Sequence, residues 1–168
     1  ILKHTLDYAL NSELIDQTIV FTDNKETKDY SIHCGAVVPF LRKSEHSRDY
    51  IDLSMVYSYY FQKLESKGIQ ADLIVSLEPA YPFRPTKLIN EMIFMCLNNG
   101  FDSVLPVVNE YAPAWLKKND LSLKRRDAGN ISRPTKNPLL IGVKGIGLVT
   151  HAEYLRNGDL LGGNCGLY

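Results

Sequence analysis

The chain has 168 residues, 45% of them hydrophobic and 23% charged, which is typical of one globular domain with an ample core. Its 19 Lys and Arg side chains balance 19 Asp and Glu, so the net charge argues against a nucleic-acid or anionic-membrane partner. No apolar run reaches the roughly 18 residues of a membrane-spanning helix. Three separated cysteines (Cys34, Cys96 and Cys165) are typical of reduced thiols, so a cytoplasmic protein is expected.

Short apolar segments alternate with amphipathic segments along the chain. Helices are predicted at residues 1–12, 25–33, 51–67, 87–99 and 151–156, with Asn24 or Asp23, Thr86 and Thr150 as N-caps. Strands are predicted at residues 17–22, 36–40, 73–77, 102–108, 138–149 and 167–168. This alternation with short links favours the α/β class, as a mostly parallel sheet covered by helices on both faces.

Residues 110–137 differ from the rest of the chain. They are polar and rich in Lys and Arg, with few apolar side chains except around Trp115. Because a long polar excursion from a compact domain is usually functional, we interpret this segment, called the arm below, as an interaction arm or an active-site flap. We expect the arm to be part of a single domain spanning residues 1–168.

Residues 72–84 (DLIVSLEPAYPFR) begin as a buried strand and end in a bend fixed by two prolines. The bend carries Glu78, Tyr81 and Arg84, three side chains able to hold a ligand. Ligands of open α/β sheets bind outside the carboxyl ends of the strands, so this bend is the centre of the predicted site. The alternative is a structural connection in which Arg84 pairs with a surface carboxylate.

Other polar residues follow predicted strands and are expected at the same edge of the sheet. They are Asp23, Arg42, Asp49, Asp52 and Glu110. Arginine suits phosphate or carboxylate because its planar fork binds two oxygens at once. The sequence has no pattern of metal ligands, no Gly-x-Ser-x-Gly elbow and no Walker loop, so no metal-binding residue is predicted. For each charge taken singly, the alternative is an ordinary solvated surface role.

Three sequence blocks keep their order and spacing within residues 1–108. The first is residues 9–24, ending in FTDN, the second is residues 35–42 (GAVVPFLR) with SRD at 47–49, and the third is residues 77–84 (LEPAYPFR). Together they resemble the acylneuraminate cytidylyltransferase family, which reads Gly-Ala-x-x-Pro-Phe-x-Arg in the second block and Leu-Gln-Pro-Thr-x-Pro-Leu-Arg in the third. Beyond Glu110 the resemblance is weak.

The resemblance implies an α/β fold of the nucleotide-diphosphosugar transferase type. It also implies transfer of CMP from CTP to a sialic-acid-like sugar acid or related sugar, with release of pyrophosphate and help from Mg²⁺, for surface glycan biosynthesis. It implies nucleotide-binding roles for Asp23, Arg42, Asp49 and Asp52, and substrate-binding roles for Glu78, Tyr81, Arg84 and Arg133. Because the family's dimers use the arm, it implies a homodimer with Trp115 as an interface anchor.

The chain departs from the family pattern at several points. The family's phosphate-binding loop is expected before Ile1 and its Asp-x-Asp stretch beyond Tyr168, so we expect a sequence truncated at both ends that binds CTP poorly. Glu78 stands where the family has Gln, and its charge should repel a sugar carboxylate unless Arg84 or a metal offsets it. These departures indicate a divergent branch with an altered sugar pocket.

Two other functions stay open on the sequence alone. A non-catalytic binding or scaffolding domain would keep the fold without the phosphate loop. Nucleic-acid binding through residues 117–136 would lose affinity steeply with salt. The zero net charge and the lack of base-stacking aromatics in that segment argue against the second alternative.

Overall fold

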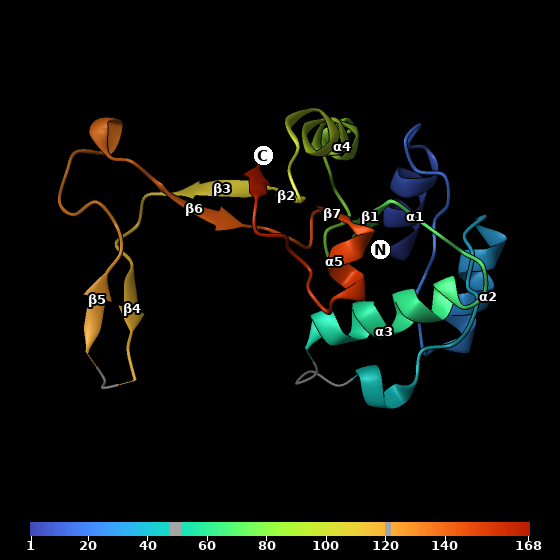
Figure 1. Ribbon diagram of the computed structural model, residues 1–168. Helices are drawn as coiled ribbons and strands as arrows, with labels where there is room; N and C mark the ends of the chain where they lie inside the picture. Colours follow the sequence, from blue (N-terminus) through green and yellow to red (C-terminus); the bar gives the residue numbers. More distant parts are fainter. Residues whose placement is uncertain (48–51, 120–121) are drawn as a thin grey trace.

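The computed structural model describes residues 1–47, 52–119 and 122–168, and it shows a four-stranded sheet between helices with a long excursion on one side (Figure 1). The helices are α1 (Leu2–Leu10), α2 (Lys25–His33), α3 (Leu53–Glu65), α4 (Leu88–Asn99), α5 (Ala152–Arg156) and the 3₁₀ helices η1 (Ser44–Ser47) and η2 (Arg133–Thr135). The strands are β1 (Leu73–Ser76), β2 (Ser103–Leu105), β3 (Val107–Glu110), β4 (Trp115–Lys117), β5 (Leu123–Arg125), β6 (Leu139–Gly142), β7 (Leu148–His151) and β8 (Cys165–Leu167). The predicted α/β class is confirmed.

The sheet has the strand order β1-β7-β2-β8 and is mixed. β7 runs antiparallel to both β1 and β2, with Val149 opposite Val75 on one side and Val104 on the other, whereas β2 and β8 are parallel. The prediction of a mostly parallel sheet was therefore wrong. The reason is the connection: the chain leaves β2 through β3 and returns through β6 into β7, without the helical crossover that a parallel neighbour needs.

Helices cover both faces of the sheet, as predicted. On one face, Leu73 and Val75 of β1 pack against a buried cluster built on α4. On the other face, Ile74 packs against a second cluster built on α3 and α5, which includes Phe61 and Leu155. Neighbouring residues of β1 thus alternate between the two faces, with the period of two that a strand imposes. This packing on both sides fixes the end of β1, where the predicted site begins.

Residues 17–22 and 36–40 are less regular than predicted. Instead of two strands they form a parallel bridge between Ile19 and Val37. Helix α2, which lies between them, begins as predicted at Asn24, whose side-chain oxygen accepts a hydrogen bond from the backbone N–H three residues later at 2.7 Å.

The other two predicted N-caps were wrong. Thr86 lies in a turn before Lys87, and Lys87 is the N-cap of α4 without a side-chain hydrogen bond. Thr150 stays in β7 opposite Ile74 and Ser103, and its buried hydroxyl has no hydrogen-bond partner in the part of the chain that the structure describes. Sheet pairing on both sides of Thr150 prevents it from turning toward the helix that follows.

The arm leaves the sheet through the paired strands β3 and β6 and ends in the β4–β5 hairpin and η2, away from the helices (Figure 1). In the antiparallel β3–β6 pair, Val108 lies opposite Ile141 and Glu110 opposite Leu139. Pro106 separates β2 from β3 within residues 102–108. Side chains of the arm and side chains at the sheet edge therefore lie in different parts of the molecule.

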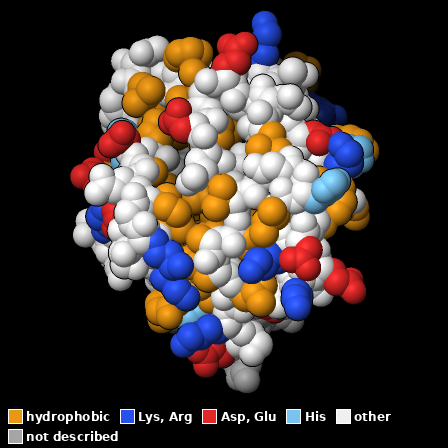
Figure 2. Space-filling model, turned by 90° about the vertical axis from the view of Figure 1, so that its right-hand side faces the viewer, with side chains coloured by type: hydrophobic (Ala, Val, Ile, Leu, Met, Phe, Trp, Pro, Cys, Tyr) orange, Lys and Arg blue, Asp and Glu red, His pale blue; other side chains and the backbone are white. Residues whose placement is uncertain are grey.

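Hydrophobic side chains are exposed on the side of the molecule that carries α1 and α2, and they gather across the middle of that face (Figure 2). Exposed apolar residues of these helices include Leu10, Tyr30 and Ile32. Among the described residues, no helix has both the length and the apolar character needed to cross a bilayer.

Candidate functional site

A small hollow lies beyond the carboxyl end of β1, where the sequence predicted the ligand site. It is lined by Leu53, Tyr57, Ser76, Glu78, Lys144, Leu148 and Leu160. The hydroxyl groups of Tyr57 and Ser76 are hydrogen-bonded to each other in its wall. The volume is about 10 Å³, which is room for one water molecule. The hollow is therefore too small to hold a nucleotide or a sugar by itself.

Two turns that bind each other bring Glu78 and Lys144 to the hollow. The Glu78 N–H donates to Gly145 O at 3.0 Å, which ties the bend after β1 to the turn before β7. Gly145 is buried and leaves no room for a side chain, because an added Cβ would lie 2.3 Å from Cε2 of Tyr81 and 2.8 Å from Oε2 of Glu78. Lys144 is a cation that lines the hollow with Glu78, whereas the sequence pointed to Arg84 or a metal as the group that could offset this carboxylate.

Arg42 is held by its backbone in the loop before η1. Its N–H donates to Thr22 O at 2.7 Å, and the N–H of Lys43 donates to the Tyr60 hydroxyl at 2.8 Å. Tyr60 is completely buried in α3 and its ring stacks on Phe40 at 5.3 Å between centroids. The aromatic core under α3 thus anchors the loop that carries Arg42.

The phenol of Tyr57 is influenced by charges from two of the predicted site residues. Burial raises the pKa of Tyr57, the hydrogen bond with Ser76 lowers it, the Glu78 charge raises it and the Arg42 charge lowers it. Charges act in this way on a group that lies close to them. Glu78 and Arg42 follow different apolar segments in the sequence, and the charges of both act on this one phenol.

The three predicted aspartates differ in their positions. Asp52 is the N-cap of α3: its Oδ1 accepts hydrogen bonds from the N–H and the hydroxyl of Ser54, both at 2.9 Å. The backbone bond is the main cause that lowers the pKa of the Asp52 carboxyl, and the charge of Lys144 lowers it further. Asp23 is exposed in the turn before α2, and Asp49 lies outside the described residues. Nucleotide binding by these aspartates stays a prediction.

Arg84 directs its guanidinium into the protein and is half-buried. Its Nε donates to Ile146 O at 2.5 Å, and its Nη1 donates to the Thr5 hydroxyl at 3.0 Å. Its Nη2 donates to Glu78 O at 2.7 Å and to Gly145 O at 3.2 Å. Burial lowers the pKa of this guanidinium. These acceptors are backbone carbonyls and a hydroxyl, so the alternative in which Arg84 pairs with a surface carboxylate was wrong.

A larger cavity, of about 460 Å³, lies in the arm. Three basic side chains, Arg125, Arg133 and Lys136, are part of its lining. The Arg133 guanidinium lies over the Tyr111 ring, 5.0 Å from its centre. The volume is in the range of small-ligand pockets, and the Arg133 guanidinium suits an acidic ligand group, whereas Arg125 and Lys136 are paired with Asp127. The predicted substrate-binding residues therefore lie in two places within one chain, with Glu78 at the sheet edge and Arg133 in the arm.

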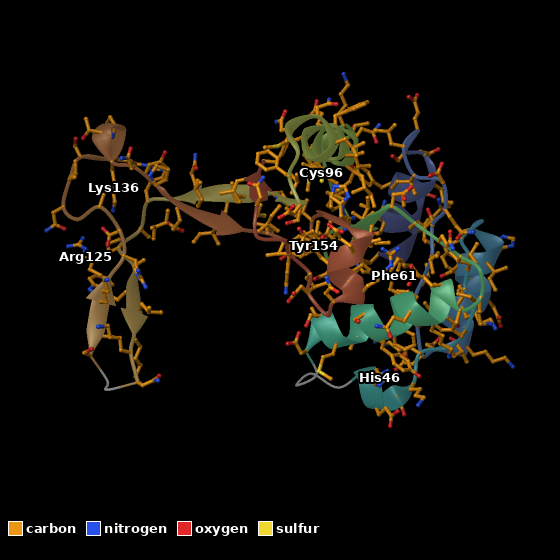
Figure 3. All side chains as sticks on the ribbon, viewed as in Figure 1. His46, Phe61, Cys96, Arg125, Lys136 and Tyr154 are labelled. Atoms are coloured by element: carbon orange, nitrogen blue, oxygen red, sulfur yellow. The ribbon has the colours of Figure 1, made fainter. Side chains whose placement is uncertain are left out.

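A buried carboxylate organises the residues around this cavity. The Asp127 side chain is 1% exposed and accepts hydrogen bonds from Arg125 at 2.8 and 3.0 Å and from Lys136 at 3.0 Å. The backbone N–H groups of Ala114 and Gly129 also donate to it. The Arg125 bond is the main cause that holds the pKa of Asp127 far below its ordinary range. Figure 3 shows Arg125 and Lys136 together in the arm, away from the labelled residues of the helices.

Sequence analysis missed three polar residues of the hollow, Tyr57, Ser76 and Lys144. Tyr57 lies among the apolar positions of the helix predicted at residues 51–67, and Ser76 interrupts an apolar run without any motif around it. Lys144 reaches the hollow because β7 returns antiparallel beside β1, a pairing that the sequence did not predict. The sequence feature that could have indicated this pairing is Gly145, since a glycine next to a strand often marks a close approach of two backbones.

The described residues do not make up a Mg²⁺ site by themselves. In residues 1–47, 52–119 and 122–168, no group of three or more His, Cys, Asp or Glu side chains is arranged to hold a metal ion. Near the hollow, Asp52 caps a helix and Glu78 lies with Lys144. Mg²⁺ is usually bound by one or two carboxylates together with substrate phosphates. We therefore assign no residue of this chain to the metal that the resemblance implies.

Comparison of the sequence with known proteins gives two matches. A family model described as cytidylyltransferase matches residues 1–139. The chain is 25% identical over 134 residues to CMP-N,N'-diacetyllegionaminic acid synthase of Legionella pneumophila subsp. pneumophila. That alignment covers 80% of this chain and 55% of the relative, so the chain spans about half the length of the curated relative.

Comparison of the fold with solved structures agrees with these matches. The fold resembles 4-diphosphocytidyl-2C-methyl-D-erythritol synthase from Anaerococcus prevotii, with a TM-score of 0.60 at 12% identity over 93% of this chain and 61% of that one. It also resembles CMP:2-keto-3-deoxy-manno-octonic acid synthetase complexed with CTP, with a TM-score of 0.59 at 13% identity over 92% and 64% of the two chains. The predicted nucleotide-diphosphosugar transferase type of fold is confirmed. Because the family model matches well over half of its residues, the chain belongs to the cytidylyltransferase family, and the resemblance carried by its three sequence blocks is confirmed.

Proposed function

We propose that the full-length protein transfers CMP from CTP to a sugar acid related to the sialic acids, and that the CMP-sugar serves surface glycan biosynthesis. The observation that carries this proposal is the cytidylyltransferase match over residues 1–139. The similarity to CMP-N,N'-diacetyllegionaminic acid synthase supports the substrate class. In the reaction, the anomeric oxygen of the sugar bonds to the α-phosphorus, the bond from that phosphorus to pyrophosphate breaks, and the hydroxyl proton is released.

Catalysis of this kind consists mainly of positioning and charge stabilisation. We assign Arg42 to the phosphates of the nucleotide, because its loop is anchored by Tyr60 and its charge reaches the Tyr57 phenol at the hollow. We assign Glu78, with the neighbouring Tyr81, to the sugar side. Asp23, Asp49 and Asp52 stay in the proposal as nucleotide-binding residues, and Asp52 also orients the start of α3.

We propose a homodimer in which the arm meets a second copy of the chain. Apolar side chains of the arm are available for such a contact, with Trp115 54% exposed and Leu123 66% exposed. Arg133 and Glu78 lie in different parts of one chain, so the arm of a second copy offers a way for both residues to reach one sugar. In this arrangement the basic cavity with Arg133 takes the sugar carboxylate.

Mg²⁺ and a cytoplasmic location complete the proposal. Mg²⁺ would arrive with the phosphates of CTP and offset their charge, and no residue of this chain is assigned to it. The cysteines Cys34, Cys96 and Cys165 are free thiols, which is typical of a reducing compartment.

Nucleotide binding tests the proposal before any turnover is measured. Isothermal titration of the full-length protein should give tighter binding of CTP than of UTP or ATP. Arg42→Ala should weaken CTP binding roughly tenfold or more, because a hydrogen bond to a charged group contributes about 1.5–3 kcal/mol. Lys25→Ala removes an exposed cation at the start of α2 and serves as the matched control with unchanged affinity. Equal affinity for all three nucleotides, or an Arg42→Ala variant that binds like wild type, would contradict the proposal.

A further inference from the structure

The guanidinium of Arg84 joins three segments that are far apart in the sequence. It donates to Glu78 O in the bend after β1. It donates to Gly145 O and Ile146 O in the turn before β7, and to the hydroxyl of Thr5 in α1. We call this guanidinium and its four acceptors the Arg84 brace.

The brace holds backbone that no strand ladder holds. β1 ends at Ser76 and β7 begins at Leu148, so the bend and the turn lie beyond the last paired residues. A planar guanidinium carries five donors in a fixed fork and can bind several carbonyls in one geometry, whereas an ammonium group on a flexible stem cannot. The brace and the hydrogen bond from Glu78 N–H to Gly145 O therefore set the position of the bend relative to the turn.

The two braced segments carry charged side chains of the hollow. Glu78 comes from the bend, and its own carbonyl accepts from Arg84. Lys144 comes from the turn and directly precedes Gly145, whose carbonyl also accepts from Arg84. Both side chains line the hollow with Tyr57. Because a displacement of about 1 Å from productive geometry can cost roughly 100-fold in rate, the brace bears directly on the site.

We propose that Arg84 is a positioning residue, which holds Glu78 and Lys144 at the hollow and does not itself contact the substrate. The inference rests on the proposed function, and it replaces the direct substrate contact that the resemblance implied for Arg84. It also makes Lys144 a residue of the site.

Hydrogen exchange tests the brace without any reaction. In the full-length protein, the amides of Glu78 and Tyr81 donate to Gly145 O and Glu78 O, and they should exchange at least about tenfold faster in Arg84→Lys than in wild type. Arg156→Ala, which removes a partly exposed arginine on α5, should leave these amides unchanged. Wild-type exchange at both amides in Arg84→Lys would overturn the proposal.

A double-mutant cycle tests whether Arg84 acts through Glu78. Arg84→Lys should lower kcat/KM at least about tenfold, and in a Glu78→Gln background the same substitution should cost much less, because the group that it positions has already changed. Losses that multiply would mean that Arg84 acts independently of Glu78, which overturns the claim that Arg84 positions Glu78. Absence of turnover in wild type would refute the proposed function and the catalytic purpose of the brace, while the exchange rates would still decide whether the brace holds the bend.

Discussion

Replacing Gly162 with alanine should destabilise the protein by about 1–3 kcal/mol, because the loop around it has no room for another carbon atom. An added Cβ would lie 2.1 Å from Cβ of Asp102 and 2.7 Å from Cζ of Tyr154. Asp102 precedes β2 and its carboxylate accepts the N–H of Asn164 at 2.7 Å, so it cannot move aside without releasing the same loop. The loop also carries Leu160 to the hollow, so CTP-dependent activity should fall together with stability.

Gly163→Ala is the matched control for this prediction. Its added Cβ would lie 4.0 Å from Oδ2 of Asp102, which is ordinary van der Waals contact. Neither glycine has a φ in the left-handed region. Alanine therefore restricts the unfolded chain equally in both variants, and the small stabilisation that this gives is the same for both. Thermal and urea unfolding should place Gly163→Ala within about 0.5 kcal/mol of wild type. Equal stability of the two variants would show that the steric argument is wrong.

Replacing Asp127 with asparagine should unfold the arm and leave the four-stranded sheet intact. Arg125, Lys136 and two backbone N–H groups converge on this carboxylate, whose side chain is 1% exposed. A neutral amide has only one acceptor oxygen and cannot balance two cations, so Arg125 and Lys136 would repel each other in a confined space. Because the partners of Asp127 among the described residues belong to the arm, the damage should stay local.

Trp115 is the single tryptophan of the chain and reports on the arm separately. It lies in β4, with the Arg125 guanidinium 5.4 Å from its ring centre. Its fluorescence should shift to longer wavelength in Asp127→Asn at temperatures where wild type is unchanged, while the helical circular dichroism stays the same. Asp29→Asn, an exposed carboxylate on α2, is the control. A wild-type Trp115 signal in Asp127→Asn would contradict the assignment of Asp127 as the organising group of the arm.

The role of Asp127 also predicts how the stability of the arm changes at low pH. Arg125 holds the pKa of Asp127 far below the ordinary value of 3.8. A carboxyl whose pKa is lowered by folding contributes stability above its unfolded pKa, and that contribution is lost as the pH falls toward the folded pKa. The Trp115 signal of wild type should therefore be constant from about pH 7 to pH 5 and report loosening of the arm below about pH 4. In Asp127→Asn this acid step should be missing.

Local patterns in the sequence predicted the helices better than the sheet. Asn24 caps α2 as expected, and Gly100 ends α4 in the left-handed conformation with φ of 66°. These features depend on neighbours within one turn of helix, so they can be read from a few consecutive residues. The antiparallel direction of β7 depends instead on how the arm returns to the sheet, and no pattern inside residues 148–151 contains that information.

The location of the candidate site was predictable, and part of its chemistry was not. Residues that follow strands were expected at one edge, and Glu78 lines the hollow with Tyr57 beyond the end of β1, while the charge of Arg42 lowers the pKa of Tyr57. Arg84 was interpreted from its charge as a ligand-binding side chain. Its acceptors are backbone carbonyls of Gly145 and other residues, and backbone carbonyls leave no trace in a sequence.

The most direct test of the proposed function is pyrophosphate release by the full-length protein with CTP and Mg²⁺. It would be measured across a panel of sugar acids and neutral sugars, with formation of the CMP-sugar confirmed for each positive reaction. The account predicts release with CTP and at least one sugar acid, and a clear loss of that release in Arg42→Ala. CTP that binds without release of pyrophosphate for any sugar, or a protein that does not bind CTP, would contradict the account and favour a non-catalytic domain with the same fold.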